Sequence, residues 1–135
     1  MNIRRFGPGH RRADRAAGSN GVLSSAIFSN DIAQITEFTV TPGGAYGPLR
    51  SAGDIVLVVI EGGGWVQVGD ERTRIAAGEA VLFPAGVPHG AWTDTTEMRA
   101  ILVEFGAGDD RVLTGYLAPG AASEPAPVER GEGSL

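Results

Sequence analysis

The hydrophobic positions of this chain fall in short runs that are separated by turn residues. From Val22 to Phe105 no segment keeps the 3.6-residue period of an amphipathic helix. The runs predict strands at residues 22–28, 33–40, 55–60, 65–68, 73–75, 80–83, 89–93 and 98–105. The segments between them, among them TPGG, EGGG, VGDE and PAGVP, contain the glycines and prolines of tight reversals. This pattern is typical of an antiparallel all-β sandwich or barrel.

The run IVLVVI at 55–60 is apolar at every position, so both of its faces should be covered. We expect one face to line a barrel interior and the other to meet a second layer or a partner subunit, which favours a homodimer. Along the predicted strand at 65–68, the side chains of Trp65 and Val66 point to opposite faces of the sheet. Along the strand at 89–93, His89 and Trp92 also point to opposite faces. With the valine inward, both tryptophans face the outer surface, where they suit a dimer interface. In the opposite register Trp65 lines a pocket instead.

The two ends of the chain differ in composition from its centre. Residues 1–20 are polar and rich in arginine, and they predict an N-terminal basic arm with a short strand at 3–6. Residues 21–117 form the predicted barrel domain, with a short helix or last strand at 109–117. Residues 118–135 contain few large apolar side chains and predict a flexible tail.

Charge and cysteine content narrow the range of partners. The chain of 135 residues has a formal net charge of −5; residues 1–20 carry +4, so the remainder carries −9. An acidic body disfavours nucleic-acid binding, because affinity for phosphate comes from clustered cations. The absence of cysteine excludes disulfides, thiolate metal sites and cysteine nucleophiles. No stretch has the apolar length of a signal peptide or a membrane span, so we expect a cytoplasmic protein with no membrane partner.

One motif has the spacing of a known family. The motif consists of Gly78, Pro84, Gly86 and His89, with five, one and two residues between successive members. Three more residues separate His89 from Thr93. This spacing resembles the second motif of the cupin superfamily, in which asparagine takes the place of Thr93. The segment around EGGG resembles the end of the family's first motif. The resemblance covers residues 43–93 and implies an all-β, cupin-like jelly-roll β-barrel.

The resemblance also implies a metal site of three histidines and one glutamate, and this sequence departs from it. The first motif is counted back from Gly62, its closing glycine. The glutamate position then falls on Ile55, and the two histidine positions fall on Leu49 with Ser51 or on Pro48 with Arg50, depending on the spacing. Of the four ligands only His89 remains. Because one imidazole among aliphatic side chains does not hold a divalent cation, we expect no metal and no other cofactor.

The same positions predict a ligand pocket. Its lining residues would be Tyr46, Leu49, Arg50, Ser51, Ile55 and His89. His89 is the candidate catalytic residue, since imidazole exchanges protons near neutral pH; the alternative is a histidine satisfied by a backbone carbonyl or a water. Arg50 either binds an anionic group of the ligand or pairs with Asp54 at the surface.

Two carboxylates interrupt apolar strands. Glu37 and Glu104 each stand next to a phenylalanine in a predicted strand. Inside a barrel such a carboxyl group would have a raised pKa and could act as an acid or a base. On a solvated outer face, which is the commoner arrangement, it would have no special role.

Three functions follow from this interpretation. The first is non-catalytic binding of a small, largely apolar organic molecule in the barrel. The second is a metal-independent isomerase, epimerase or cyclase that uses His89 as its acid or base. The third is a metal-dependent dioxygenase or isomerase with rearranged ligands.

Overall fold

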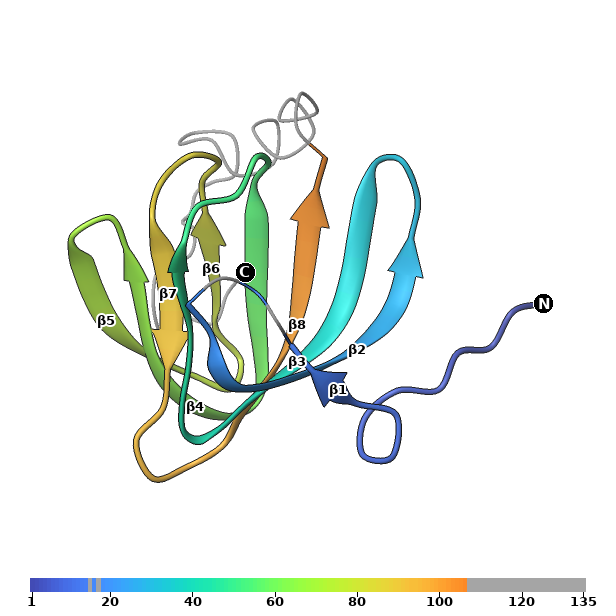
Figure 1. The fold of residues 1–135 in the computed structure, drawn as a ribbon, viewed down its shortest axis with the longest axis horizontal. Coiled ribbons are helices and arrows are strands. Elements are labelled where there is room, and N and C mark those ends of the chain that lie inside the picture. The colour runs from blue at the N-terminus through green and yellow to red at the C-terminus, as the bar shows by residue number, and fades with distance from the viewer. Residues whose placement is uncertain (15, 17, 107–135) are drawn as a thin grey trace.

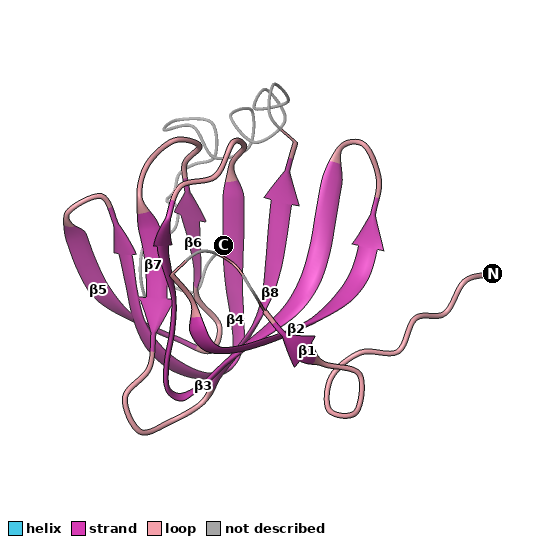
Figure 2. Ribbon diagram, in the orientation of Figure 1, coloured by secondary structure: helices cyan, strands magenta, loops and turns pink. Residues whose placement is uncertain are grey.

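The computed structural model of the chain describes residues 1–14, 16 and 18–106 (Figure 1). Every helix or strand assigned within this part is a β-strand (Figure 2). In chain order these are β1 (Arg12–Ala13), β2 (Asn20–Ser29), β3 (Ala33–Leu49), β4 (Ile55–Val68), β5 (Glu71–Ala76), β6 (Ala80–Phe83), β7 (His89–Trp92) and β8 (Met98–Phe105). In the described part there is no helix of the length and apolarity needed to cross a bilayer. The features expected at 109–117 and 118–135 lie outside the described residues.

The long strands β3 and β4 contribute to both walls of the barrel. The first half of β3 pairs with β2 and β8, and the first half of β4 pairs with β6 and β8. Their second halves both pair with β7, and β4 pairs there with β5 as well. All of these pairings are antiparallel, and the two walls join through the shared strands (Figure 1). The all-β, jelly-roll β-barrel predicted from the sequence is confirmed by this topology.

The long strands also contradict two predicted turns. The segments TPGG and EGGG lie inside β3 and β4, and the pairing of β4 with β8 shifts register between Val59 and Glu61. Gly62 has a φ of 72°, and a Cβ atom there would collide with the carbonyl oxygen of Glu97. Glycine therefore lets β4 bend and press against a neighbouring backbone without ending the strand.

The apolar run of β4 divides between the two faces of the sheet. Ile55, Leu57 and Val59 are buried in the core, as predicted for the inner face. On the outer face Val58 is partly buried, and Ile60 remains 42% exposed. The partner subunit that is expected to cover this face stays a prediction.

The N-terminal segment folds back onto the barrel. The His10 N–H donates to the Gly7 carbonyl at 2.9 Å, and Gly9 has a φ of 91°. With Pro8 before it, this is the geometry of a type II turn, which needs a glycine-like φ at its third residue. The turn leads into β1, which pairs with β2. The strand predicted at 3–6 is wrong, and Ile3 in that segment is 77% exposed.

Candidate functional site

His89 occupies the first position of β7, directly after the segment PAGVP, and its side chain is completely buried. Its Nε2 lies 3.1 Å from the Tyr46 hydroxyl oxygen, and its Nδ1 lies 3.4 Å from the Val87 carbonyl oxygen. The Phe83 ring stacks on the imidazole with a centroid distance of 4.3 Å and an interplanar angle of 16°. The imidazole is therefore held by contacts at both nitrogens and on one face.

The protonation states of this pair follow from burial. Burial lowers the pKa of His89 below 6.5, and its hydrogen bond to the Val87 carbonyl offsets only part of that effect. Burial also raises the pKa of Tyr46, and the nearby charges of Glu104 and Asp14 raise it further. At neutral pH the imidazole is neutral and the phenol is protonated. We assign the Nδ1 proton to the bond with Val87, so that the Tyr46 hydroxyl donates to Nε2.

Four of the predicted pocket residues meet inside the barrel. Leu49 lies opposite His89 in the pairing of β3 with β7, and Tyr46 lies opposite Ala91. Ile55 pairs with Phe83, whose ring packs on His89. Tyr46 and Ile55 are buried, and Leu49 is partly buried against the core. The first motif of the resemblance thus locates one wall of the interior, although it contributes aliphatic side chains there.

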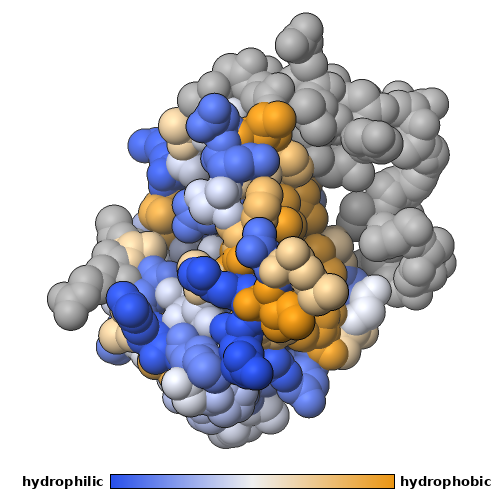
Figure 3. Space-filling model, turned by 90° about the vertical axis from the view of Figure 1, so that its right-hand side faces the viewer, coloured by the Kyte–Doolittle hydropathy of each residue, from blue (hydrophilic) through white to orange (hydrophobic). Residues whose placement is uncertain are grey.

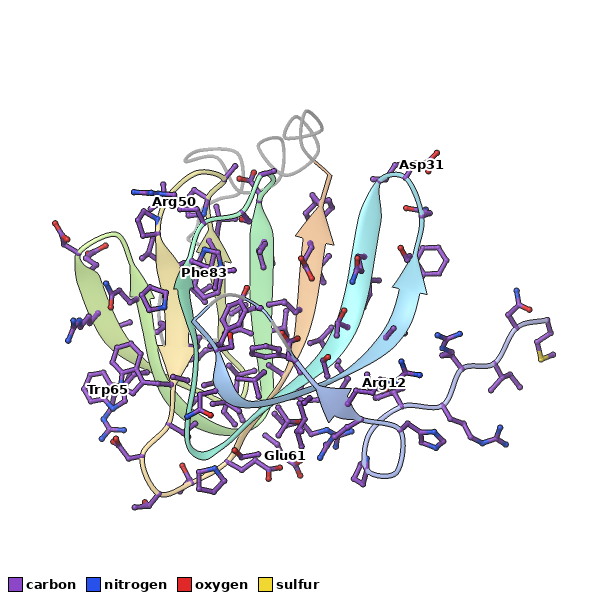
Figure 4. The ribbon with its side chains drawn as sticks, viewed as in Figure 1. Arg12, Asp31, Arg50, Glu61, Trp65 and Phe83 are labelled. Atoms are coloured by element: carbon purple, nitrogen blue, oxygen red, sulfur yellow. The ribbon has the colours of Figure 1, made fainter. Side chains whose placement is uncertain are left out.

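The other two predicted pocket residues lie at the end of the barrel. Arg50 is exposed at the rim above Phe83 (Figure 4). The predicted pairing of Arg50 with Asp54 is wrong, because no ion pair joins them in the described structure and Asp54 instead accepts a hydrogen bond from the Ala85 N–H at 2.8 Å. The Ser51 hydroxyl donates to the Gly53 carbonyl at 2.7 Å, so it stabilises the loop.

The side chains around His89 do not fit a transition metal. Leu49 and Ile55 offer only hydrocarbon, and the Ser51 hydroxyl is bonded within its own loop. The Nε2 lone pair of His89 faces the Tyr46 hydroxyl. Imidazole-bound Fe, Mn, Ni or Zn needs about three protein ligands in fixed geometry. Within the described ranges, no three histidine, aspartate or glutamate side chains are grouped so as to hold an ion.

The interior also contains polar groups at a second position. Glu104 lies opposite Ile55 and shares the inner face of β8 with buried Leu102. Burial raises the pKa of Glu104, and the charge of Asp14 adds to that shift. The expectation of an unremarkable, solvated carboxylate is therefore wrong for Glu104. In the described structure no hydrogen bond or ion pair reaches its carboxyl group.

Thr36 is a further polar residue of this wall, which sequence reasoning missed. It lies opposite Leu102 in the pairing of β3 with β8, and its residue is only 7% exposed. Its Oγ1 is buried and has no hydrogen-bond partner. The available signal was the two-residue alternation of β3, which places Thr36 on the same face as Phe38.

Glu37 has a structural role on the other face of the same strand. Its side chain is completely buried, which contradicts the expected solvated position. Arg11 donates to its two oxygens at 3.2 and 2.8 Å, and Arg99 donates to Oε2 at 2.6 Å. Burial alone would raise the pKa of Glu37, but the hydrogen bonds and charges of the two arginines lower it below 4.5. This ion cluster fixes the N-terminal segment to the barrel.

The two tryptophans stack on one another. Trp65 and Trp92 are cross-strand partners with a centroid distance of 6.1 Å and an interplanar angle of 7°. Arg74 lies 4.7 Å above Trp65, and Arg72 lies 5.7 Å from Trp92. The valine beside them, Val66, is buried, so the pair occupies the outer face as the alternation predicts. Whether a second subunit covers the pair stays a prediction.

Comparisons with known proteins agree with this architecture. A conserved protein of unknown function from Streptococcus pyogenes is 26% identical with a TM-score of 0.57, over 62% of this chain and 73% of that one. The polyketide cyclase RemF from Streptomyces resistomycificus is 24% identical with a TM-score of 0.69, over 78% and 80%. A cupin-2 domain from Rhodospirillum rubrum is 18% identical with a TM-score of 0.65, over 78% and 76%. No curated protein sequence matches the chain.

The decisive comparison is with a family of sequences. The cupin domain family matches residues 36–105, which include β4 to β8 and most of β3. That range contains the Gly78–His89 motif and both walls of the barrel interior. The chain belongs to the cupin domain family.

Proposed function

We propose that the barrel interior binds a small, largely apolar organic molecule that carries a polar group at each of two positions. At one position the molecule meets the Tyr46–His89 pair, and at the other it meets Thr36 and Glu104. Ile55 pairs on one side with Phe83, whose ring stacks on His89, and on the other side with Glu104, so the two positions flank one buried side chain.

The observation that carries this proposal is the unpartnered hydroxyl of Thr36. A buried polar atom without a hydrogen bond costs about 1–3 kcal/mol, and native proteins retain few of them. Thr36 Oγ1 is such an atom, and Glu104 beside it has a carboxyl group whose pKa is raised by burial. A bound molecule with a hydroxyl, carbonyl or amide group would supply the missing partner.

The remaining lining accounts for the apolar character of the ligand. The inner face bears large buried hydrocarbon side chains, namely Phe38, Ile55, Leu57, Phe83 and Leu102. Small-molecule sites commonly combine such a lining with a few placed polar groups. The proposed ligand therefore has a hydrocarbon body with two polar positions.

The Tyr46–His89 hydrogen bond favours a second candidate, a metal-independent isomerase, epimerase or cyclase. A neutral buried imidazole can accept a proton from a substrate, and the Tyr46 hydroxyl can donate one. RemF is named as a polyketide cyclase, but at 24% identity it supports the fold only. The bonded pair itself is the argument for this candidate.

Binding is tested on the protein as purified. Compounds released by organic solvent are identified by mass spectrometry, and binding of each compound is measured by titration calorimetry. We expect Thr36→Val to weaken binding about tenfold, which is the value of one lost hydrogen bond in a dry site. Thr73→Val on the exposed surface of β5 is the matched control and should bind as the wild type does. Equal affinity in all three proteins would refute the proposed site.

Catalysis is tested separately from binding. The bound compound is incubated with protein in deuterated water, and exchange of its carbon-bound hydrogens is followed by NMR. An acid–base enzyme predicts exchange that His89→Gln abolishes and Tyr46→Phe slows, with binding retained. Absence of exchange in the wild type would leave the binding function and remove the catalytic one.

A further inference from the structure

A pocket lies outside the barrel, between the N-terminal segment and β2. Its volume is about 580 Å³. Its lining residues are Arg4, Arg5, Gly9, His10, Arg11, Arg12, Ser24, Ser25 and Ala26. Four guanidinium groups thus line a cavity that contains no acidic lining residue, in a protein whose net charge is −5. Figure 3, which faces this side, shows strongly hydrophilic residues gathered next to a hydrophobic band.

The arginines of this pocket differ in their partners. Arg11 is partly buried, and its charge is offset by Glu37. Arg4 donates from Nε to the Ala26 carbonyl at 3.3 Å, a contact with an uncharged group that helps to orient the guanidinium. No ion pair within the described structure includes Arg4, Arg5 or Arg12. Three positive charges therefore face one cavity without a protein anion to balance them.

The backbone gives this pocket its shape. The turn at Gly7–His10 reverses the chain, and Gly7 packs against the guanidinium of Arg99. Strand β1 then places Arg12 opposite Ser24 in the pairing with β2. Arg11 is tied to Glu37, so the segment that carries the cationic residues is anchored at one point inside the cluster. The cations are consequently held by a folded segment in the structure.

We propose that this pocket binds a small molecule that bears two adjacent phosphate groups. Planar guanidinium groups form paired hydrogen bonds with phosphate oxygens, and such charge-assisted bonds are the stronger class. Three unbalanced arginines match the charge of a diphosphate group more closely than that of a single phosphate. The volume lies in the range of small-molecule sites and is too small to enclose a macromolecule. The site is independent of the barrel interior and of the function proposed for it.

The test uses the full chain with inorganic diphosphate as the probe. Affinity is measured by titration calorimetry at low and high salt, with inorganic phosphate in parallel. We expect diphosphate to bind more tightly than phosphate, and the double substitution Arg5→Gln with Arg12→Gln to weaken diphosphate binding by about tenfold per arginine removed. Both residues are exposed, so the fold should persist. Unchanged affinity in the double variant would overturn the proposal.

A matched control separates a site from general charge. Arg72→Gln with Arg74→Gln removes the same charge beside the stacked rings of Trp92 and Trp65, and Trp65 lies on the opposite side of the molecule from Arg12 (Figure 4). We expect this variant to bind diphosphate as the wild type does, and an equal loss in both variants would overturn the proposal. Single-stranded DNA is the third probe. Binding of DNA that requires Arg5 and Arg12 and resists competition by diphosphate would assign the pocket to a nucleic acid instead.

Discussion

Replacing Glu37 by glutamine removes the buried charge that joins the N-terminal segment to the barrel. Glutamine has nearly the same shape, so the substitution leaves no cavity. It leaves Arg11 and Arg99 facing each other across a neutral amide, with side chains that are 14% and 26% exposed. We expect a large loss of stability, because two cations lose their shared anion in a place that water reaches poorly.

The magnitude follows from the three hydrogen bonds that Arg11 and Arg99 donate to the Glu37 carboxylate. Each hydrogen bond between charged groups contributes about 1.5–3 kcal/mol. Glutamine keeps one accepting oxygen and turns an N–H donor toward an arginine, so we expect about half of the combined contribution to be lost. The arginines regain part of their hydration, which reduces the cost of their repulsion. We therefore expect the free energy of unfolding to fall by about 3 kcal/mol and the melting temperature by roughly 10 °C.

Urea denaturation followed by tryptophan fluorescence measures this loss. Glu71→Gln, at an exposed position of β5, is the control and should change stability by less than about 0.5 kcal/mol. Arg11→Gln should be intermediate, because Arg99 still pairs with Glu37. A Glu37→Gln protein as stable as the control would refute the assigned role of the ion cluster.

The same comparison predicts a pH dependence. The pKa of Glu37 is below 4.5 in the folded chain, so the unfolded chain binds a proton first as the pH falls. The stability that the carboxylate contributes is complete above pH 4.5 and is lost as the pH falls below it toward the lowered pKa. The difference between wild type and Glu37→Gln should shrink over that interval. A difference that stays constant in acid would contradict the ion-pair explanation.

Four further substitutions test other parts of the structure by urea denaturation. The pKa of His89 is lowered below 6.5 in the folded chain, so the unfolded chain binds a proton first as the pH falls. The stability of the wild type should therefore fall as the pH drops below 6.5, and His89→Gln should weaken this dependence. Gly62→Ala should lower the free energy of unfolding by about 2 kcal/mol or more, because the position has a positive φ and a Cβ atom there would collide with the Glu97 carbonyl. Gly78 also has a positive φ but lies in open space, so Gly78→Ala should lower it by only about 1 kcal/mol. Thr36→Val should leave the ligand-free protein equally stable or up to about 1 kcal/mol more stable, since it removes an unpartnered hydroxyl. Stability that is independent of pH, equal costs for the two glycines, or a clear loss for Thr36→Val would contradict these assignments.

Hydrophobic alternation predicted most of the strands, because burial on one face imposes a two-residue period. The predicted limits of the sixth and eighth strands, 80–83 and 98–105, agree with β6 and β8. Alternation did not reveal that EGGG continues β4. Glycine is used both for turns and for close backbone contacts within a sheet, and a single sequence does not distinguish the two.

The candidate site was predicted in part. The motif that ends at His89 identified the interior wall, and the structure adds Tyr46 as the hydrogen-bond partner, 43 positions earlier in the chain. No local pattern indicates that contact, because the pairing of β3 with β7 creates it. The same reason explains Glu37, whose partners Arg11 and Arg99 stand 26 and 62 positions away. Contacts between distant parts of the chain therefore decide that Glu37, and not Glu104, is paired with arginines.

The contrast between Glu37 and Glu104 is the strongest physical argument for the location of function. Glu37 is completely buried and Glu104 is partly buried, on strands that pair with each other. The chain supplies two arginines to Glu37, so it is able to satisfy a buried charge where only stability is at stake. It supplies no such partner to Glu104 or to the Thr36 hydroxyl within the described residues. Natural proteins keep such local conflicts mainly at functional sites, and both conflicts here face the barrel interior.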